Sequence, residues 1–472
     1  MQNGKCRVES DCIGNVEVGG ECYYGGQTAR AVENYRITRI PISHYPRLVG
    51  SLAMVKKGAA LANMELGMLD GTIGKAIVAA CDEILAGKLH EQFVVDVIQG
   101  GAGTSTNMNA NEVVANRALE LLGHEKGQYE FCHPNIHVNM SQSTNDVYPT
   151  ALRMTLIRGI RLLMRALEQL QFRLEEKGAE FMDVLKIGRT QLQDAVPMSL
   201  GQEFHAWAVT VGEDIQRLDE ARLLVREINM GATAIGTGLN AHPQYAALVT
   251  KKLVELSGQP LLLAPNLVEA TQDTGAYVQL SGVLKRVAVK VSKICNDLRL
   301  LSSGPRAGLG EINLPSMAPG SSIMPGKVNP VIPEVVNQVA YAVIGGDVTV
   351  TMAAEAGQLE LNVMEPVIAH TLFHSMDMMR RAFLTLAERC VKGISANRER
   401  CRELMEKSIG LATALNPYIG YDKSTEVAKE ALATGRAVTD IVLEKGYLSP
   451  ERLAEVLRPE NMLGPRPFAN EA

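Results

Sequence analysis

The 472-residue sequence predicts a mainly α-helical protein built around a bundle of long helices. Apolar residues recur at alternating steps of four and three from Leu280 to Leu301, which places them on one face of a long helix. A similar series runs from Leu152 to Leu174. Aromatic residues make up only 4% of the chain, and a core of Leu, Val, Ile, Ala and Met suits packed helices better than packed sheets.

The order of these patterns predicts three domains. Residues 1–140 have mixed, mostly helical patterns with glycine-rich turns, and form a predicted N-terminal domain. Residues 141–397 form a predicted central helix-bundle domain, and residues 398–472 a small C-terminal helical domain. Besides the series that begins at Leu152, the long helices expected in the central domain are Ser199–Glu227, Tyr277–Ser303, Pro333–Val350 and about Gln358–Cys390.

The C-terminal segment carries local helix signals. Ser424 and Thr425 are predicted to open a helix that Gly435 closes. Ser449 precedes Pro450, the typical order of an N-cap followed by proline at the first helical position. Both patterns indicate short helices.

Charge and cysteine content exclude several classes of protein. The 47 basic and 52 acidic residues are well mixed and give a formal net charge of −5, which argues against a nucleic-acid or membrane-surface protein. No apolar run approaches 18 residues, and no signal pattern opens the chain, so a cytoplasmic protein is expected. The eight cysteines include no C-x-x-C pair, which favours reduced thiols. Long helices with narrow apolar seams further predict a homo-oligomer.

The segment from Gly304 to Pro333 interrupts the helical pattern. It contains five glycines and six prolines and shows no periodicity. A loop of this length inside a compact protein is usually functional. Five apolar residues favour an ordered loop and are expected to anchor it, although a structural connector stays open: Ile312, Leu314, Ile323, Met324 and Val328.

Three further polar clusters accompany this loop: Gly103–Asn107, Ser141–Asp146 and Gly188–Asp194. Their hydroxyl and amide groups stand beside residues that turn easily, a combination suited to binding carboxylates. Each cluster alone is more typical of a helix cap or turn. Their joint occurrence on one helical scaffold favours a binding site.

Other motifs fail on inspection. Gly320 and the Gly326-Lys327 pair are separated by five residues instead of the four of a phosphate-binding loop, and valine follows the lysine. His370 and His374 lack the carboxylate of a metalloprotease helix, so packing is the favoured interpretation. His133 and His137 receive the same interpretation, and no metal-binding residues are predicted.

The motif GSSIMPGKVNP at residues 320–330 resembles the signature of the fumarase/aspartase superfamily. The resemblance runs from about Asp11 to about Glu460 and is greatest to the ammonia-lyases of the superfamily. Fumarases typically have Ser-Ser-Asn-Asp at residues 143–146 and His-Thr-Gln-Asp at residues 191–194, where this chain differs. The segments that carry the closer resemblance include GGAGTSTNMNANEV, SQSTNDVYPT, GRTQLQDAVPMSLGQEF and TMAAEAGQLELNVMEPV.

The resemblance implies a three-domain fold whose helix bundle assembles into the core of a homotetramer, with each active site shared between three subunits. It implies that Ser321 is the general base, and that other residues bind the substrate. Thr104, Ser143, Thr144 and Ser322 match those that hold the β-carboxylate, Lys327 and Asn329 those that hold the α-carboxylate, and Asn145, Thr190 and Gln191 those around the amino group.

The reaction implied is the reversible elimination of ammonia from L-aspartate to give fumarate, through an enediolate-like carbanion. No organic cofactor is expected, and Mg²⁺ is considered as an activator. Gln191 cannot act as an ordinary general acid, which favours loss of ammonia over loss of water. A class II fumarate hydratase, a lyase for a substituted aspartate and a non-catalytic structural protein stay open as alternatives.

Overall fold

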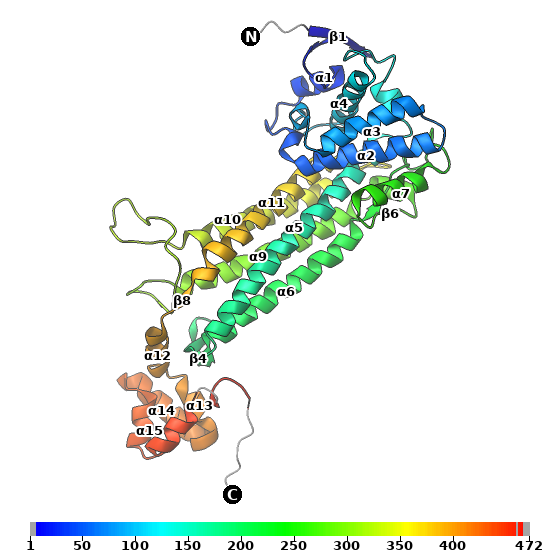
Figure 1. The fold of residues 1–472 in the computed structure, drawn as a ribbon. Helices are drawn as coiled ribbons and strands as arrows, with labels where there is room; N and C mark the ends of the chain where they lie inside the picture. The colour runs from blue at the N-terminus through cyan, green and yellow to red at the C-terminus, as the bar shows by residue number, and fades with distance from the viewer. Residues whose placement is uncertain (1–5, 459–460, 466–472) are drawn as a thin grey trace. The chain divides into compact units, whose positions relative to one another are not determined.

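The computed structural model of the chain describes residues 6–458 and 461–465, and its regular structure is mainly α-helical, as predicted (Figure 1). The residues form two compact units, each of which gathers separate stretches of chain. The three-domain division stays a prediction, because it follows the sequence whereas the units combine distant segments. Unit 1 consists of Met1–Met164, Gln216–Arg286 and Tyr341–Met378, and unit 2 of Arg165–Ile215, Val287–Ala340 and Met379–Ala472.

Unit 1 contains a layer of shorter helices. In Figure 1, α2 lies side by side with α3 and with α7. Gly58 of α2 permits the close approach of α7, since a β-carbon at this position would lie 2.8 Å from a methyl carbon of Leu253. The helices of this part are α1 (Gly26–Asn34), α2 (Pro46–Glu65), α3 (Gly71–Leu85), α4 (Thr104–Leu121), α7 (Tyr245–Ser257) and α8 (Leu267–Gln272), with short helices at Ile42–His44, His90–Gln92 and Pro134–Val138.

The long helices confirm the periodicity prediction. All the seam residues between Leu280 and Leu301, and between Leu152 and Leu174, are buried. Each long helix contributes residues to both units. The helices are α5 (Thr144–Glu180), α6 (Leu200–Leu224), α9 (Gly275–Leu301), α10 (Val331–Glu355) and α11 (Glu365–Arg389).

Helix α5 begins at Thr144, earlier than the apolar series indicates, and Pro149 lies inside it. Proline has no N–H, so it leaves the carbonyl four residues earlier without its helical donor. That carbonyl belongs to Asn145, and it accepts a hydrogen bond of 2.9 Å from Asn229 Nδ2. A side chain therefore replaces the missing backbone donor and lets the helix continue through the proline.

Helix α11 begins at Glu365, later than predicted. Asn362 Nδ2 donates to the carbonyl oxygens of Ala353 and Ala354 at the end of α10, and Asn362 Oδ1 accepts from Met364 N–H at 2.8 Å. This buried carboxamide stabilises a separate turn between α10 and α11. The residues from Gln358 to Met364, which were predicted to belong to the helix, are therefore not helical.

Paired polar groups fix α9 against α10 within each unit. In unit 1, Asp347 accepts hydrogen bonds from Ser281 Oγ at 2.7 Å and Lys285 Nζ at 2.5 Å. In unit 2, Asn337 Nδ2 donates to Ser292 Oγ at 2.8 Å. Shifting one helix along the other would leave these buried groups without partners, so they define the register.

Strands are few and short. The described residues contain four two-stranded sheets, of which the β5–β6 pair is parallel and the others are antiparallel. The strands are β1 (Cys6–Asp11), β2 (Gly14–Gly19), β3 (Leu185–Thr190), β4 (Gln193–Ser199), β5 (Glu227–Ile228), β6 (Leu262–Leu263), β7 (Ile312–Asn313) and β8 (Ser395–Ala396).

The C-terminal helices in unit 2 pack around a hydrophobic cluster that includes Leu415, Val427 and Ile441. Ser449 is the N-cap of the last helix and Gly435 ends α14 with φ of 70°, as predicted, although α14 begins at Tyr421. The helices are α12 (Arg398–Glu406), α13 (Leu411–Ile419), α14 (Tyr421–Thr434), α15 (Val438–Glu444) and α16 (Pro450–Val456), preceded by a short helix at Val391–Gly393.

Among the helices of the described residues, none combines the length and the hydropathy that crossing a membrane requires. Five cysteines are buried free thiols, in agreement with the expected reduced state: Cys81, Cys132, Cys295, Cys390 and Cys401.

Glu365, the first residue of α11, generates a prediction about pH. Burial raises the pKa of Glu365 to about 8, although the nearby Arg153 acts in the opposite direction. The folded chain therefore holds this proton more tightly than the unfolded chain, and the free energy of unfolding falls as pH rises from about 4.5 to about 8. Glu365→Gln removes this component, on the order of a few kcal/mol. Urea unfolding between about pH 5 and 8.5, at one protein concentration, measures the difference.

The matched control is Glu360→Gln, because Glu360 is exposed. This control is expected to keep the pH dependence of the original chain. Equal pH dependence in the Glu365→Gln variant and the original chain would contradict the assignment.

Candidate active site

The cluster Gly103–Asn107 is the start of α4. Gly103 is the residue before the helix and has φ of 88°, and a β-carbon there would lie 2.4 Å from the ring of Tyr148. Thr104 is the first residue of α4, is exposed, and donates through Oγ1 to the Gly101 carbonyl at 2.7 Å. The cluster thus combines a helix N-terminus, which favours anions, with an exposed hydroxyl.

The cluster Ser141–Asp146 is the start of α5. Ser143 Oγ accepts from Asn145 N–H at 3.3 Å, and Ser143 N–H donates to Asp146 Oδ1 at 2.9 Å. Asn145 Nδ2 donates to the Ala234 carbonyl at 2.7 Å. The cluster therefore serves as a helix cap, and its hydroxyl and amide groups gather at a second helix N-terminus.

The two clusters meet inside unit 1. Asn107 Nδ2, in the first turn of α4, donates to Thr144 Oγ1, in the first turn of α5, at 3.1 Å. This hydrogen bond brings the starts of both helices together. The predicted substrate-binding residues of unit 1 therefore belong to adjacent elements: Thr104, Ser143, Thr144 and Asn145.

A buried ammonium lies beneath this region. Lys56 of α2 is fully buried, and burial lowers its pKa to about 7. Asp146 is also buried, and burial raises its pKa to about 7, while the attraction between the two opposite charges acts against both shifts. Asp146 Oδ2 accepts from the backbone N–H groups of Gly231 and Thr233, each at 3.0 Å.

Sequence reasoning missed Lys56, whose ammonium donates to the side-chain oxygens of Asn107, Asn139 and Gln142, although Asn107 and Gln142 belong to the predicted polar clusters. A signal was present, because Lys56 follows Leu52 by four residues and precedes Ala59 by three, and both of these neighbours are buried. A lysine on the apolar face of a helix requires acceptors. The sequence alone does not identify those acceptors.

The cluster Gly188–Asp194 is a β-hairpin in unit 2. Thr190 pairs with Gln193, so Gln191 and Leu192 form a two-residue turn. Their φ values are 55° and 61°, the left-handed conformation that such tight hairpins require and that glycine or asparagine usually supplies. The side chains of Gln191 and Leu192 are both exposed. Gln191 therefore lies at the tip of the hairpin, on backbone whose positive φ is strained for a residue other than glycine.

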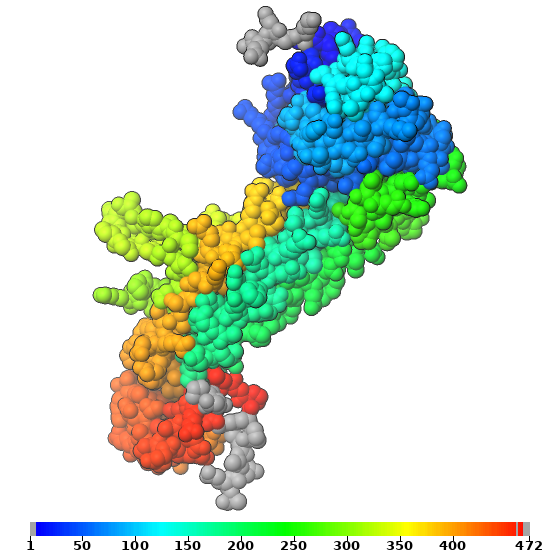
Figure 2. Space-filling model, in the orientation of Figure 1, coloured from blue at the N-terminus to red at the C-terminus, as the bar shows by residue number. Residues whose placement is uncertain are grey.

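The long loop connects α9 to α10 in unit 2, and Figure 2 shows it, in yellow-green, projecting from its unit. Ile312 is buried and Leu314 is partly buried, so both anchor the stem of the loop. The expectation that apolar residues also anchor its tip is wrong. Ile323, Met324 and Val328 are 84%, 48% and 50% exposed, because the loop projects beyond the apolar surface of its own unit.

The tip of the loop is closed on itself by hydrogen bonds. Gly320 N–H donates to the Lys327 carbonyl at 2.8 Å, and Asn329 Nδ2 donates to the Gly320 carbonyl at 2.7 Å. A β-carbon at Gly320 would lie 2.3 Å from the Lys327 carbonyl oxygen, so this closure requires glycine. Ser322 and Lys327 are exposed on the closed tip.

Ser321 Oγ accepts two backbone hydrogen bonds, from Ile323 N–H at 3.2 Å and from Met324 N–H at 3.0 Å. Donors aimed at an oxygen stabilise its ionised form. The tip therefore supplies part of the stabilisation that a serine general base needs.

The stem of the loop shares a buried charge cluster with the hairpin. Glu311 is fully buried, and its carboxylate contacts Lys186 Nζ at 2.9 Å and Arg189 Nη2 at 2.8 Å. Lys186 also contacts Glu203 at 2.6 Å. Since Lys186 and Arg189 belong to β3, this cluster fixes the loop stem against the strand that leads to Thr190 and Gln191.

Replacing Glu311 by alanine leaves Lys186 and Arg189 without their shared partner. We expect the free energy of unfolding to fall by about 3–5 kcal/mol, the usual cost of breaking a buried ion pair from one side. Urea unfolding measures the loss. Glu399→Ala is the control, since Glu399 is exposed and pairs with exposed Arg402, and it is expected to change the free energy by less than about 0.5 kcal/mol. A similar small loss for Glu311→Ala would refute the structural role of the cluster.

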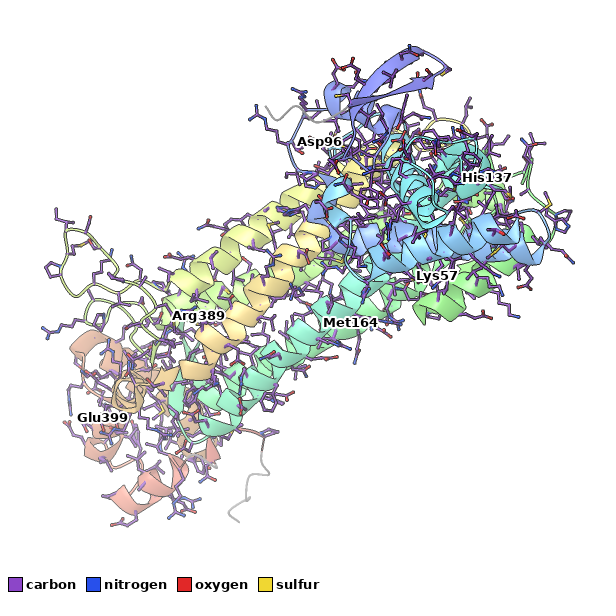
Figure 3. The ribbon with its side chains drawn as sticks, turned by 45° about the horizontal axis from the view of Figure 1, so that its top comes forward. Lys57, Asp96, His137, Met164, Arg389 and Glu399 are labelled. Atoms are coloured by element: carbon purple, nitrogen blue, oxygen red, sulfur yellow. The ribbon has the colours of Figure 1, made fainter. Side chains whose placement is uncertain are left out.

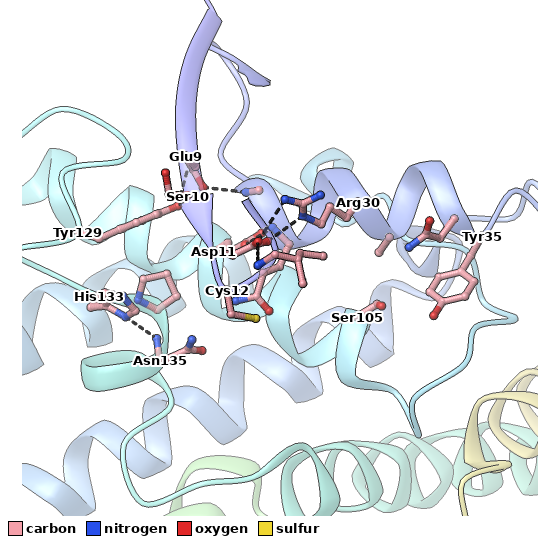
Figure 4. Close-up of a pocket in the computed structure, with 17 residues that line it drawn as sticks. Glu9, Ser10, Asp11, Cys12, Arg30, Tyr35, Ser105, Tyr129, His133 and Asn135 are labelled. Atoms are coloured by element: carbon pink, nitrogen blue, oxygen red, sulfur yellow. Dashed lines mark hydrogen bonds and ion pairs between the residues drawn. The ribbon is translucent and has the colours of Figure 1, made fainter. Parts of the chain in front are cut away.

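A cavity of about 430 Å³ in unit 1 lies beside β1, α1 and the short helix Pro134–Val138, and Ser105 of the first cluster also lines it (Figure 4). Its two buried carboxylates are already used. Glu112 accepts from the N–H groups of Gly25 at 2.7 Å and Gln27 at 2.9 Å, and Glu9 accepts from Gly26 N–H at 2.7 Å. These carboxylates cap the N-terminus of α1, so the cavity does not carry the predicted chemistry.

The described residues contain no group of three or more His, Cys, Asp or Glu side chains placed to hold a metal ion. His370 Nδ1 is hydrogen-bonded to Tyr45 Oη at 2.8 Å, and its ring stacks on that of His374. His133 Nδ1 accepts from Asn135 N–H at 3.0 Å, as Figure 4 shows, and His137 Nδ1 accepts from His133 N–H at 2.8 Å. These contacts agree with the interpretation of the four histidines as packing residues.

The predicted site residues therefore form two sets in one chain. Unit 1 presents one set at the starts of α4 and α5, and unit 2 presents the other on the hairpin turn and the loop tip. The second set consists of Thr190, Gln191, Ser321, Ser322, Lys327 and Asn329.

Comparison with known proteins gives a consistent result. Residues 14–345 match a family model described as "Lyase", and residues 411–464 match one described as "Fumarase C C-terminus". An aspartate ammonia-lyase of Helicobacter pylori is 59% identical over 462 residues, which cover 98% of this chain and 99% of the relative.

Solved structures agree on the fold. A fumarate lyase:delta crystallin structure from Brucella melitensis, bound to cobalt, is 57% identical and superposes with a TM-score of 0.96, covering 98% of this chain and all of that one. A class II fumarase of Schistosoma mansoni is 36% identical with a TM-score of 0.92, over 98% of this chain and all of that one.

Proposed function

The chain belongs to the fumarase/aspartase lyase family, and from this premise we propose that it eliminates ammonia from L-aspartate to give fumarate. The observation that carries the proposal is the 59% identity to an aspartate ammonia-lyase over 98% of this chain. The residues at 143–146 and 191–194, which differ from those typical of fumarases, support ammonia as the leaving group.

The first chemical problem is the proton on Cβ of aspartate, which is not acidic. Its removal becomes feasible when the β-carboxylate accepts the developing negative charge as an enediolate-like group. Hydroxyl donors on Ser143, Thr144 and Ser322 would stabilise this charge more than the ground state, each by roughly 3–4 kcal/mol by analogy with oxyanion holes. Thr104 would join them by exchanging its hydrogen bond to the Gly101 carbonyl for one to the substrate. The helix N-termini at α4 and α5 add positive ends of two helix dipoles.

The second problem is the base. An isolated serine hydroxyl is too weak an acid to ionise near neutral pH. The two backbone N–H donors at Ser321 Oγ and the positive charge of Lys327 on the same tip support its ionised form. We assign Ser321 as the base that takes the Cβ proton, and Lys327 with Asn329 as the residues that bind the α-carboxylate.

The third problem is the leaving group. An ammonium group already carries the proton with which it leaves as ammonia, so the Cα–N bond can break without a general acid. Asn145, Thr190 and Gln191 would orient this group by hydrogen bonds. The balanced reaction converts L-aspartate to fumarate and ammonia. We propose that this reaction needs no organic cofactor and that Mg²⁺ acts as an activator. We also propose that the protein is located in the cytoplasm.

The proposal is tested by the ultraviolet absorbance of fumarate formed from L-aspartate and, in parallel, from L-malate. We expect activity on L-aspartate that falls by about 10²–10⁴-fold in Ser321→Ala, the usual contribution of a general base. Ser316→Ala is the control on the same loop, because Ser316 lies outside the closed tip, and it is expected to keep full activity.

Each other outcome identifies a different function. Activity on L-malate alone would make the protein a fumarate hydratase. Inactivity on both substrates would point to a lyase for a substituted aspartate or to a structural protein.

We propose further that the protein is a homotetramer with each active site shared between three subunits. Helix α10 supports this proposal, since Val335, Tyr341, Val348 and Met352 are 42–67% exposed along it. Apolar side chains at such spacing on a long helix need a covering surface. The homotetramer also accounts for the presence of the site residues as two sets in one chain.

Mixed tetramers test the shared site. If Ser321 and Thr144 of one site come from different subunits, co-expression of Ser321→Ala and Thr144→Val chains, each of low activity alone, restores sites that hold both residues. About one quarter of the sites regain activity with random mixing in a closed assembly. Ser321→Ala mixed with Lys327→Met is the control, because both changes lie on one loop, and it is expected to stay inactive. Equal inactivity of both mixtures would place Ser321 and Thr144 in the same subunit.

A further inference from the structure

We infer that Lys56 is a positioning residue that, through Asn107, fixes the Thr144 hydroxyl as a hydrogen-bond donor to the substrate. The inference rests on the proposed function, in which Thr144 holds the β-carboxylate. Lys56 itself lies beneath the site, since it is fully buried on α2.

The ammonium of Lys56 has a complete set of acceptors. Nζ donates to Asn107 Oδ1 at 2.6 Å, to Asn139 Oδ1 at 2.9 Å and to Gln142 Oε1 at 2.9 Å. A lysine ammonium has three N–H donors and no acceptor, so these three carboxamide oxygens use all of its capacity. Each carboxamide must therefore turn its oxygen toward Lys56.

This requirement orients Asn107. Its oxygen faces Lys56, so its NH₂ group faces away, and it donates to Thr144 Oγ1 at 3.1 Å and to Asn139 Oδ1 at 3.2 Å. Rotating the carboxamide by half a turn would place an NH₂ group against the buried ammonium. That arrangement is strongly unfavourable, because it would leave an N–H group of a buried charge without an acceptor.

The orientation of Asn107 in turn decides how Thr144 bonds. Thr144 Oγ1 accepts a hydrogen from Asn107, so its own hydrogen cannot point toward Asn107 and is directed elsewhere. A hydroxyl that donates is the form that stabilises a developing carboxylate charge. The buried charge of Lys56 therefore orients the Asn107 carboxamide, and Asn107 in turn leaves the Thr144 hydroxyl hydrogen free to point toward the substrate.

Surrounding contacts hold the same arrangement. Asn139 Nδ2 donates to the Gln142 carbonyl at 3.1 Å, and Gln142 Nε2 donates to the Val138 carbonyl at 2.9 Å. These bonds agree with oxygens turned toward Lys56. The buried carboxylate of Asp146 attracts the ammonium and balances its charge.

Asn107→Asp tests this arrangement with little change of shape. The variant carries an oxygen in place of the NH₂ group, so the Thr144 hydroxyl must donate to the new carboxylate and is lost to the substrate. This carboxylate still accepts from Lys56, and it loses the hydrogen bond of 3.2 Å to Asn139 Oδ1, so urea unfolding of the variant accompanies the kinetics. We expect kcat/KM for L-aspartate to fall by about 10²-fold, as for the loss of one donor to a carboxylate whose charge grows in the transition state.

A double-mutant cycle with Thr144→Val separates this role from a structural one. Thr144→Val removes the hydroxyl that Asn107 orients. Asn107→Asp is therefore expected to change kcat/KM of the Thr144→Val enzyme by less than about two-fold. Equal losses in both backgrounds, or full activity of Asn107→Asp, would overturn the inference.

Lys56→Met is the second variant, and Lys57→Met is its matched control. Lys57 is the next residue on α2, labelled in Figure 3, and it pairs with Asp82 at 2.5 Å away from the amide cluster. We expect a loss of kcat for Lys56→Met only. Should Lys56→Met fail to fold, the cycle at Asn107 decides.

Binding of succinate, measured by calorimetry, provides a readout that does not depend on turnover. Asn107→Asp is expected to weaken binding in the original chain and to leave it unchanged in Thr144→Val. If the original chain is inactive on L-aspartate, the proposed function fails, while this binding cycle still tests the inference. If the chain is active and the cycle is additive, the inference fails alone.

Discussion

Burial of the apolar seams along α5 and α9 is the interaction on which the rest of the structure depends. The seam residues are 0–5% exposed, and the polar groups that fix α10 against α9, Asp347 and Asn337, are paired. Rigid helices with a fixed register can support elements that would not be stable by themselves. The left-handed turn at Gln191 and the exposed loop tip at Ser321 are elements of that kind.

Periodicity predicted the long helices because their seams repeat over many turns, and a repeated signal averages out local exceptions. Local exceptions explain the errors at the helix ends. The early start of α5 depends on Asn229, which replaces the donor that Pro149 lacks, and these residues are 80 positions apart. The late start of α11 depends on Asn362, which satisfies carbonyl groups of the preceding helix. Asn229 is too distant in sequence to be identified as a partner, and Asn362, although close to both helices, has no pattern that indicates this role.

In the candidate site, too, local motifs were visible in the sequence whereas long-range contacts were not. Its hydroxyl and amide residues could be proposed from the sequence because they form compact motifs whose composition is unusual between helices. Ile323, Met324 and Val328 were misjudged because apolar composition indicates burial but does not say in which chain the covering surface lies. Lys56 was missed because its partners come from α4 and from the turn before α5, which only the fold brings together.

The salt bridges of Glu311 have a consequence for the conformational entropy of the loop. They fix the loop at its stem, and the hydrogen bonds of Gly320 and Asn329 close its tip, so the stretch between Asn313 and Gly320 joins two parts that are each held in shape. The entropic cost of bringing a tethered segment into place grows with its free length. A loop divided into fixed parts therefore has less disorder to give up when it orders around a ligand than an open loop of the same length, and more of the ligand's binding free energy is left for other uses.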